Sequence, residues 1–427
     1  HARYEWNGKD GSQVSVLPWV GRDESRLISR FGGTPSELVL DSTLYGLRTS
    51  WRGRAASFLT ATVGLDVEAV SRSARRAGSV VSPPREGDIR VFGQPPTDQV
   101  NTDTWNVVSG SAAPFAEADF AVLGERLHVV PGLRLEPTIT SVNRRIPKGN
   151  AADVGAYVEK TEVQPRISLR YQLSDRVLFK AAYGVYGQAP LAEELSSVFG
   201  NPLLESASAK HWLAGGAFQL TKSLGLETTV FYSRSKGLVV RNPISAPRIA
   251  EALIDNGEGR SFGSQILLRQ DLTGGFFGWV AYTLLRSERL DGPDADWRLF
   301  DFDQTHVLTA LAAYDLGAGF DVGARVRFAS GYPRTPVVGS FYDARRDGYS
   351  PVLGAHNGTR IPEFIQLDVR AAKRFDIGKT KLEVYVDVQN VSDRENAEEI
   401  VYSANYSEKR YIRGLPVLPI FGAKWDW

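Results

Sequence analysis

The segment FDVGARVRF at residues 320–328 alternates an apolar side chain with one that is polar or small. The same alternation recurs in IQLDVRAA at 365–372 and in KLEVYVDV at 381–388. Successive side chains of a β-strand point to opposite faces, so each segment has one apolar face and one polar face. This pattern is typical of a strand that has lipid on one side and a watery lumen on the other.

Segments with strand character continue over nearly the whole chain. Several exceed about ten residues, which is long for a soluble sheet and suits a tilted crossing of a bilayer. About seventeen strands are predicted. They lie near 2–6, 12–22, 37–52, 55–71, 105–123, 127–141, 163–173, 176–187, 209–222, 225–236, 260–272, 275–287, 303–316, 319–330, 363–375, 380–392 and 416–427.

Short and long connections between these strands alternate along the chain. Strict alternation places the short turns at one end of the strands and the long loops at the other, as in outer-membrane barrels with short periplasmic turns and long extracellular loops. The pattern therefore predicts an all-β, transmembrane, antiparallel up-and-down β-barrel. Short turns are predicted at Asn7-Gly8, Arg52-Gly53, Gly124-Glu125, Ser174-Asp175, Lys222-Ser223, Gly274-Gly275, Gly317-Ala318 and Ile377-Gly378, and long loops at 72–104, 142–162, 188–208, 237–259, 288–302, 331–362 and 393–415.

Composition excludes several classes of protein. The net charge of the 427-residue chain is +1, so nothing indicates a nucleic-acid partner, and the absence of Cys excludes disulfides and thiolate metal sites. No stretch approaches the roughly eighteen apolar residues of a membrane-spanning helix. A soluble antiparallel sheet with one face on a core remains the alternative to a membrane barrel, and the consistent sorting of loop lengths favours the barrel.

The C-terminal strand, 416–427, ends on alternating aromatic residues. Trp425 and Trp427 share one face of this strand. A terminal aromatic on an alternating strand resembles the signal that the assembly machinery reads in bacterial outer-membrane barrels. These two residues are the predicted assembly signal.

Longer motifs resemble one family, the TonB-dependent outer-membrane receptors. The resemblance is collinear over roughly residues 163–427, and the first 160 residues agree only in pattern. It is carried by YGVYGQAP at 183–190, FGNP at 199–202, FDQTHVL at 302–308, FASGYPRTP at 328–336, VDVQNV at 386–391 and RYIRGLP at 410–416. The resemblance implies a barrel of about 22 strands that is filled by an N-terminal plug domain, with a short TonB box that engages TonB.

The sequence departs from this family at its N-terminus. Plug domain, TonB box and about five early strands are not visible, and the chain contains no Met. We therefore expect residues 1–427 to be an N-terminally truncated barrel portion, with the remainder in another chain or outside this sequence. The resemblance implies the bacterial outer membrane as the location. The partners it implies are the membrane's lipids, the plug or missing N-terminal part, the TonB energy-transducing system and other envelope proteins.

No group of residues predicts catalysis, a cofactor or a metal site. Asp301 and Asp303 lie on one face of a strand and His306 on the other, so they do not converge. The neighbouring carboxylates of Glu193 and Glu194 are expected to face water. We expect a protein that is not an enzyme and needs no cofactor.

Two sets of residues are candidates for function. Polar-face residues are expected to point into the lumen and to meet a plug or a passing solute: Arg166, Arg170, Arg325, Arg327, Asp368, Arg370, Arg374, Lys381, Glu383 and Asp387. Aromatic residues and Arg dominate binding hot spots. The candidate ligand-binding loop residues are Tyr332, Arg334, Phe341, Tyr342, Arg345, Arg346 and Tyr349.

The predicted function is that of a receptor and transporter. The long loops would bind a scarce solute, such as a metal chelate, vitamin or oligosaccharide, and TonB-coupled rearrangement of the plug would import it. The alternative is a structural barrel that anchors partner proteins in an outer-membrane complex. An outer-membrane enzyme would require a clustered nucleophile, base and acid, for which the sequence offers no candidate.

Overall fold

The computed structural model describes residues 1–31, 34–81, 85–89, 91–92, 100–144, 155–244, 250–292, 294–344 and 347–426. One antiparallel sheet of 18 strands forms most of it. Neighbours in sequence are neighbours in the sheet, in the order β1 to β12, then β14, β15, β20, β21 and β24, with β13 added to β12. This is the up-and-down order that the sequence predicts.

The strands of the large sheet vary widely in length. They are β1 Tyr4–Asn7, β2 Gln13–Phe31, β3 Thr34–Ala56, β4 Leu59–Gly78, β5 Asn101–Val122, β6 Leu127–Arg144, β7 Ala156–Ser174, β8 Val177–Gln188, β9 Ala207–Gln219, β10 Leu224–Arg241, β11 Leu253–Thr273, β12 Phe276–Leu290, β13 Arg298–Leu299, β14 His306–Gly317, β15 Phe320–Ala329, β20 Phe364–Ile377, β21 Thr380–Gln389 and β24 Leu418–Asp426. Short elements in the loops are the 3-10 helix η1 Ala192–Leu195 and the strands β16 Pro333–Arg334, β17 Val337–Asp343, β18 Gly348–Leu353, β19 Thr359–Arg360, β22 Ala397–Tyr402 and β23 Lys409–Arg413.

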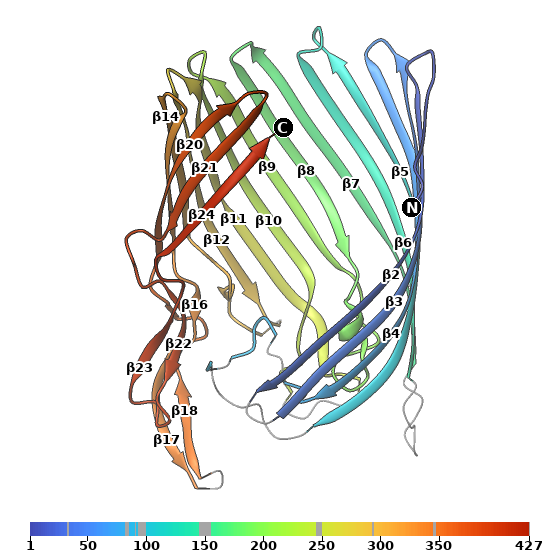
Figure 1. Ribbon diagram of the computed structural model, residues 1–427. Helices are drawn as coiled ribbons and strands as arrows, with labels where there is room; N and C mark the ends of the chain where they lie inside the picture. Colours follow the sequence, from blue (N-terminus) through green and yellow to red (C-terminus); the bar gives the residue numbers. More distant parts are fainter. Residues whose placement is uncertain are drawn as a thin grey trace.

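The sheet curves into the wall of a barrel (Figure 1). Tight turns lie at the upper end in Figure 1 and the long loops at the lower end, which confirms the predicted sorting. Gly274 and Gly275 form one of these turns with φ of 59° and 83°, a backbone that glycine adopts without steric cost. Hairpins β17–β18 and β22–β23 extend the loop end beyond the wall.

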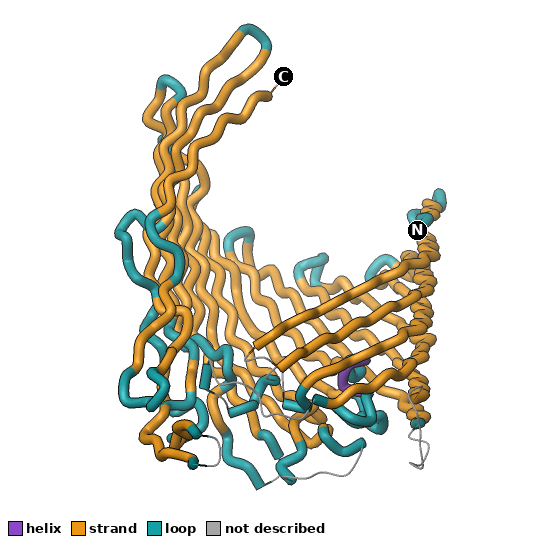
Figure 2. Tube along the Cα trace, turned by 60° about the horizontal axis from the view of Figure 1, so that its bottom comes forward, coloured by secondary structure: helices purple, strands orange, loops and turns teal. Residues whose placement is uncertain are grey.

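The wall is open along one side (Figure 2). Among the described residues, β24 pairs only with β21 and β1 pairs only with β2, so two sheet edges face the gap. No helix in the described part of the chain is long and apolar enough to span a membrane.

Each of the seventeen predicted strands has a counterpart, and several strands are longer than predicted. Residues 23–31 and 34–36 belong to β2 and β3, although the sequence places them in a connection. The turn predicted at Arg52-Gly53 is wrong, because β3 continues to Ala56 and β4 begins at Leu59. Outside the membrane both faces of a strand meet water, so the apolar alternation on which the prediction depends disappears there.

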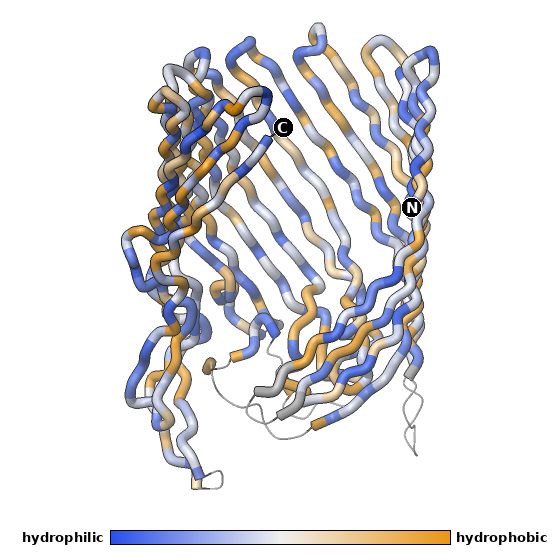
Figure 3. The backbone as a smooth tube through the Cα atoms, viewed as in Figure 1, coloured by the Kyte–Doolittle hydropathy of each residue, from blue (hydrophilic) through white to orange (hydrophobic). Residues whose placement is uncertain are grey.

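The two faces of the wall differ in chemistry, and hydropathy alternates along each strand (Figure 3). On the outer face, apolar grooves follow neighbouring strands, one over β7–β10 and one over β12, β14, β15, β20 and β21. Ion pairs such as Arg325–Asp368, with 2.7 Å between Nη2 and Oδ2, lie on the opposite, lumenal face. This is the arrangement that lipid outside and water inside would select.

Candidate functional site

The loop between β8 and β9, residues 189–206, packs against the lumenal face of β5. Trp105, whose side chain is fully buried, donates a hydrogen bond of 3.0 Å from Nε1 to the Ala192 carbonyl oxygen. Ser196 donates from Oγ to Oδ2 of the buried Asp103 at 2.7 Å. Around these bonds lies the apolar cluster of Ala74, Trp105, Val107, Val142, Ala192, Leu195, Leu204 and Leu253. The loop is therefore a packed element inside the mouth of the barrel.

A second contact joins this loop to the β4–β5 loop. The Arg85 guanidinium lies 2.5 Å from Oε1 of Glu194, while Oε2 of Glu194 accepts a hydrogen bond of 2.7 Å from the Leu191 backbone amide. The expectation that Glu194 faces water is wrong, because its side chain is only 8% exposed. Arg76 also lies over the ring of Phe199, at 4.3 Å from its centroid.

Arg298, in β13, is the centre of an ion-pair network at the mouth. Its nearly buried guanidinium reaches Asp291 at 2.5 Å, Glu86 at 2.9 Å and Asp301 at 3.0 Å. Glu86 belongs to the β4–β5 loop, so the network ties that loop to the β12–β14 loop. Burial raises the pKa of the Glu86 carboxyl, although the neighbouring arginines oppose the shift.

The β15–β20 loop joins the same network. Asn357 donates from Nδ2 to Oδ1 of Asp301 at 2.7 Å, and Arg360 pairs with Asp303. Asp303 is fully buried and accepts from the Ser287 amide at 2.6 Å, so it anchors the loops to β12. Burial lowers the pKa of the nearby His356, and Arg298 lowers it further.

Asp301, Asp303 and His306 do not meet at one point. His306 instead lies 2.8 Å from the Tyr282 hydroxyl on the outer face. In the described residues no group of three His, Cys, Asp or Glu is placed to hold a metal ion.

Beneath the β8–β9 loop the lumen contains a polar cavity of about 340 Å³. Three carboxylates, of Glu68, Glu136 and Glu162, line it together with Arg166 and Tyr186. The Arg166 guanidinium lies 4.8 Å from the centroid of the Tyr186 ring. The cavity is therefore lined by both hydrogen-bond donors and hydrogen-bond acceptors.

The ten residues predicted to face the lumen share the face opposite the apolar grooves. Asp368 is the most engaged of them, with Arg325 at 2.7 Å and Arg327 at 3.8 Å. Arg370 pairs with Glu383 at 2.8 Å, and Arg374 pairs with Asp321 at 2.8 Å. Arg166, Arg170, Lys381 and Asp387 occupy the same face by strand register. Their role toward a plug or a solute stays a prediction.

The predicted ligand-binding residues separate into two groups. Arg334 is held by Glu399 of β22, with Nε–Oε1 and Nη2–Oε2 both at 2.7 Å, and its guanidinium lies 5.9 Å from the Tyr332 ring centroid. Phe341, Tyr342 and Tyr349 lie on the projecting β17–β18 hairpin and are exposed. Arg345 and Arg346 lie outside the described residues.

The predicted assembly signal is placed in part. Trp425 is in β24, paired with Leu382, and its exposed side chain lies on the outer face. Trp427 lies outside the described residues.

Sequence reasoning missed the residues that organise the mouth, chiefly Trp105, Asp103, Ser196 and Arg298. One signal was available for Trp105, because the two-residue period places it with Val107 and Ser109 on the polar face of its strand. A large aromatic residue on a lumenal face needs a packing partner. The partner itself, 87 residues away, has no local signal.

A family model described as the β-barrel of TonB-dependent receptor-like proteins matches residues 2–391. Three solved structures have the same fold. The ferric citrate transporter FecA in its unliganded form aligns with a TM-score of 0.71, 16% identity, and coverage of 99% of this chain and 60% of that chain. The siderophore receptor PiuA from Acinetobacter baumannii aligns with a TM-score of 0.68 and 12% identity, and the alignment covers 99% of this chain and 63% of that chain. The ferric-catecholate import receptor Fiu from K12 E. coli aligns with a TM-score of 0.64 and 14% identity, and the alignment covers 99% of this chain and 63% of that chain.

The chain therefore spans about three-fifths of the length of these solved chains. No curated protein sequence matches it significantly.

Proposed function

Because this chain belongs to the TonB-dependent receptor β-barrel family, we propose that it binds a scarce solute at its long loops and admits the solute through its lumen. Family membership confirms the predicted location in the bacterial outer membrane and the prediction that the chain is not an enzyme. The observation that carries the proposal is the interlocked mouth. The β8–β9 loop lies over a polar lumenal cavity, and ion pairs join the β4–β5 loop to the β8–β9 and β12–β14 loops.

A ferric or other metal chelate is the solute class that we favour. Ferric citrate and ferric catecholate are named for two of the solved structures with this fold, and these names motivate the proposal for this chain. The exposed aromatic side chains of Phe341, Tyr342 and Tyr349 supply rigid contact area on the outermost hairpin. Vitamins and oligosaccharides are the remaining candidates.

The complete receptor would contain more than these residues. Backbone N–H and C=O groups at the free edges of β1 and β24 would have no hydrogen-bond partner in lipid. Each such group costs on the order of several kcal/mol. Additional strands outside this sequence would pair with both edges and close the barrel. An N-terminal plug would fill the lumen, pair with the lumenal arginines and carry the TonB box.

The test is uptake by cells that produce the full-length receptor containing this chain. Radiolabelled ferric chelates are offered one at a time, with and without a protonophore that removes the energy source of TonB. We expect one chelate class to enter, and the protonophore to abolish its entry. Background uptake for every chelate, together with tight co-purification of envelope proteins, would instead support the anchoring role.

A further inference from the structure

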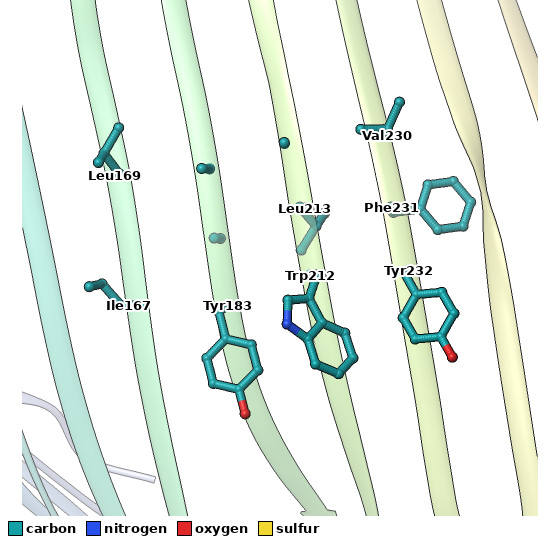
Figure 4. A pocket seen from close by; sticks show the side chains of 11 residues that line it. Ile167, Leu169, Tyr183, Trp212, Leu213, Val230, Phe231 and Tyr232 are labelled. Carbon is teal, nitrogen blue, oxygen red and sulfur yellow. The ribbon is translucent and has the colours of Figure 1, made fainter.

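The outer face of β8–β10 carries a row of aromatic side chains at one level. Tyr183, Trp212 and Tyr232 are direct cross-strand neighbours, and successive ring centroids are 5.4 Å apart (Figure 4). They line an apolar groove of about 570 Å³ with Ile167 and Val230. Tyr and Trp with one apolar and one polar end are typical of the membrane–water interface.

A row of cations lies two residues further toward the loops on the same face. Lys210, Arg234 and Arg260 are direct neighbours across β9, β10 and β11. Two residues along a strand correspond to roughly 7 Å, so this row lies just beyond the aromatic row. Like charges that face each other across strands are destabilising unless an anion lies between them.

Two more cations, Lys236 and Arg286, extend the cluster, and two carboxylates only partly balance it. Glu258 is shared by Arg234 at 2.8 Å and Lys236 at 3.7 Å. Glu288 is shared by Arg260 and Arg286. Among the described residues Lys210 has no ion-pair partner. The basic cluster of β9–β12 therefore consists of five cations and two anions.

The opposite side of the wall shows that this imbalance is local. On the outer face of β2–β4, the charged residues at the loop end whose side chains the structure describes balance each other. They are three cations and three anions: Arg22, Arg26, Arg75, Glu24, Glu37 and Asp41. A general need for solubility above the membrane would not place the excess positive charge on one set of strands.

We propose that the basic cluster of β9–β12 binds the phosphate group of an anionic lipid in the outer leaflet, whose acyl chains lie on the aromatic groove below. The loop end of the sheet is its extracellular end. The cluster is thus at the level where outer-leaflet head groups lie. Lys and Arg supply the charge-assisted hydrogen bonds that phosphate oxygens accept. The proposal depends on the outer-membrane location and not on the transported solute.

The test measures lipid binding by the full-length receptor containing this chain, purified in detergent and stripped of lipid. Diphosphorylated lipid A is the probe, and native mass spectrometry with a thermal-unfolding shift gives the affinity. The variant combines Lys210→Gln, Arg234→Gln and Arg260→Gln. A matched control combines Arg22→Gln, Arg26→Gln and Arg75→Gln on the opposite wall. Heat-modifiable migration on gels verifies that both variants are folded.

We expect the cluster variant to lose at least about tenfold in affinity for the probe, and the control to lose less than about twofold. Dephosphorylated lipid A should bind the wild type as weakly as the probe binds the cluster variant. Equal affinity of the cluster variant and the wild type would overturn the proposal. It would also be overturned if inorganic phosphate, which lacks acyl chains, displaced the probe at comparable concentration.

Discussion

The indole Nε1 of Trp105 donates a 3.0 Å hydrogen bond to the carbonyl oxygen of Ala192, which lies in η1 at the mouth of the barrel. Both side chains are buried, and the bond joins the lumenal face of β5 to the β8–β9 loop. The loop is thereby held inside the mouth by an apolar core and not by charges alone. Its position is expected to depend on that core.

Replacing Trp105 by Phe should loosen the β8–β9 loop. The ring stays largely apolar, but the Ala192 carbonyl loses its donor, at a cost of about 1 to 2 kcal/mol. Hydrogen exchange of residues 192–204 should accelerate accordingly. The control is Trp212→Phe on the outer face, which should leave that exchange unchanged. Equal exchange in the two variants would show that the bond does not hold the loop.

Replacing Arg298 by Gln should release two loops together. Its side chain is 6% exposed and neutralises Asp291, Asp301 and Glu86, so its loss leaves three partly buried carboxylates without this counter-charge. Because the carboxylates are partly exposed, the expected cost is about 1 to 3 kcal/mol, less than for a fully buried pair. Limited proteolysis should then cleave residues 85–92 and 291–305. Arg410→Gln, at a site 83% exposed, is the control that should remain resistant.

The mouth should become less stable as the pH falls below neutrality. Burial and Arg298 lower the pKa of His356 from its ordinary value of 6.5, so the unfolded state binds more protons than the folded state just below that pH. Stability from this group is fully present above pH 6.5 and is lost as the pH falls from that value through the lower pKa of the folded state. The charged groups around His356 are Arg298, Asp301, Asp291 and Asp88.

A His356→Gln variant tests this contribution. Its melting temperature should fall less than that of the wild type between pH 7.5 and pH 5.5. The raised pKa of Glu86 acts in the opposite sense, since protonation at low pH relieves the penalty of burying that carboxylate. The comparison of wild type with His356→Gln isolates the histidine, and parallel pH profiles would contradict the prediction.

Asp368 should be more important for stability than its lumenal neighbour Asp387. Asp368 accepts hydrogen bonds from Arg325 at 2.7 Å and from the Asn390 amide at 2.9 Å. Asp368→Asn should cost about 1 to 3 kcal/mol in urea unfolding, because Arg325 loses its counter-charge. Asp387 has no ion-pair partner among the described residues, so Asp387→Asn should change stability by less than about 0.5 kcal/mol.

The two groups of predicted ligand residues should behave differently. Phe341 is 56% exposed, so Phe341→Ala should leave stability nearly unchanged while it weakens solute binding. Arg334→Gln should instead lower the melting temperature, because it breaks the bidentate pair with Glu399. Calorimetric titration with the transported solute and thermal unfolding separate the two effects. A stability loss in Phe341→Ala would contradict this assignment.

Much of the wall could be predicted from sequence because its signal is local. In KLEVYVDV at 381–388 every second residue faces lipid, and the two-residue period follows from strand geometry alone. Residues 23–31 escaped prediction because charges such as Glu24 and Arg26 occupy a strand above the membrane, where burial no longer selects apolar residues. The roles of the loop residues were harder to predict than the strands, because they depend on distant contacts. Arg334, for example, is held by Glu399, which is 65 residues away in the sequence.

The alternation of side chains along the sequence was sufficient to determine that this chain is a membrane barrel wall, because apolar side chains mark the lipid-facing side of each strand. The alternating loop lengths determined that the long loops lie at one end. Only the tertiary structure decided that the β8–β9 loop folds inward and that Arg298 joins three carboxylates. Only the tertiary structure also aligned Lys210, Arg234 and Arg260 in one row. These arrangements depend on strand register and on contacts between distant loops, and register is set by pairing along the whole wall.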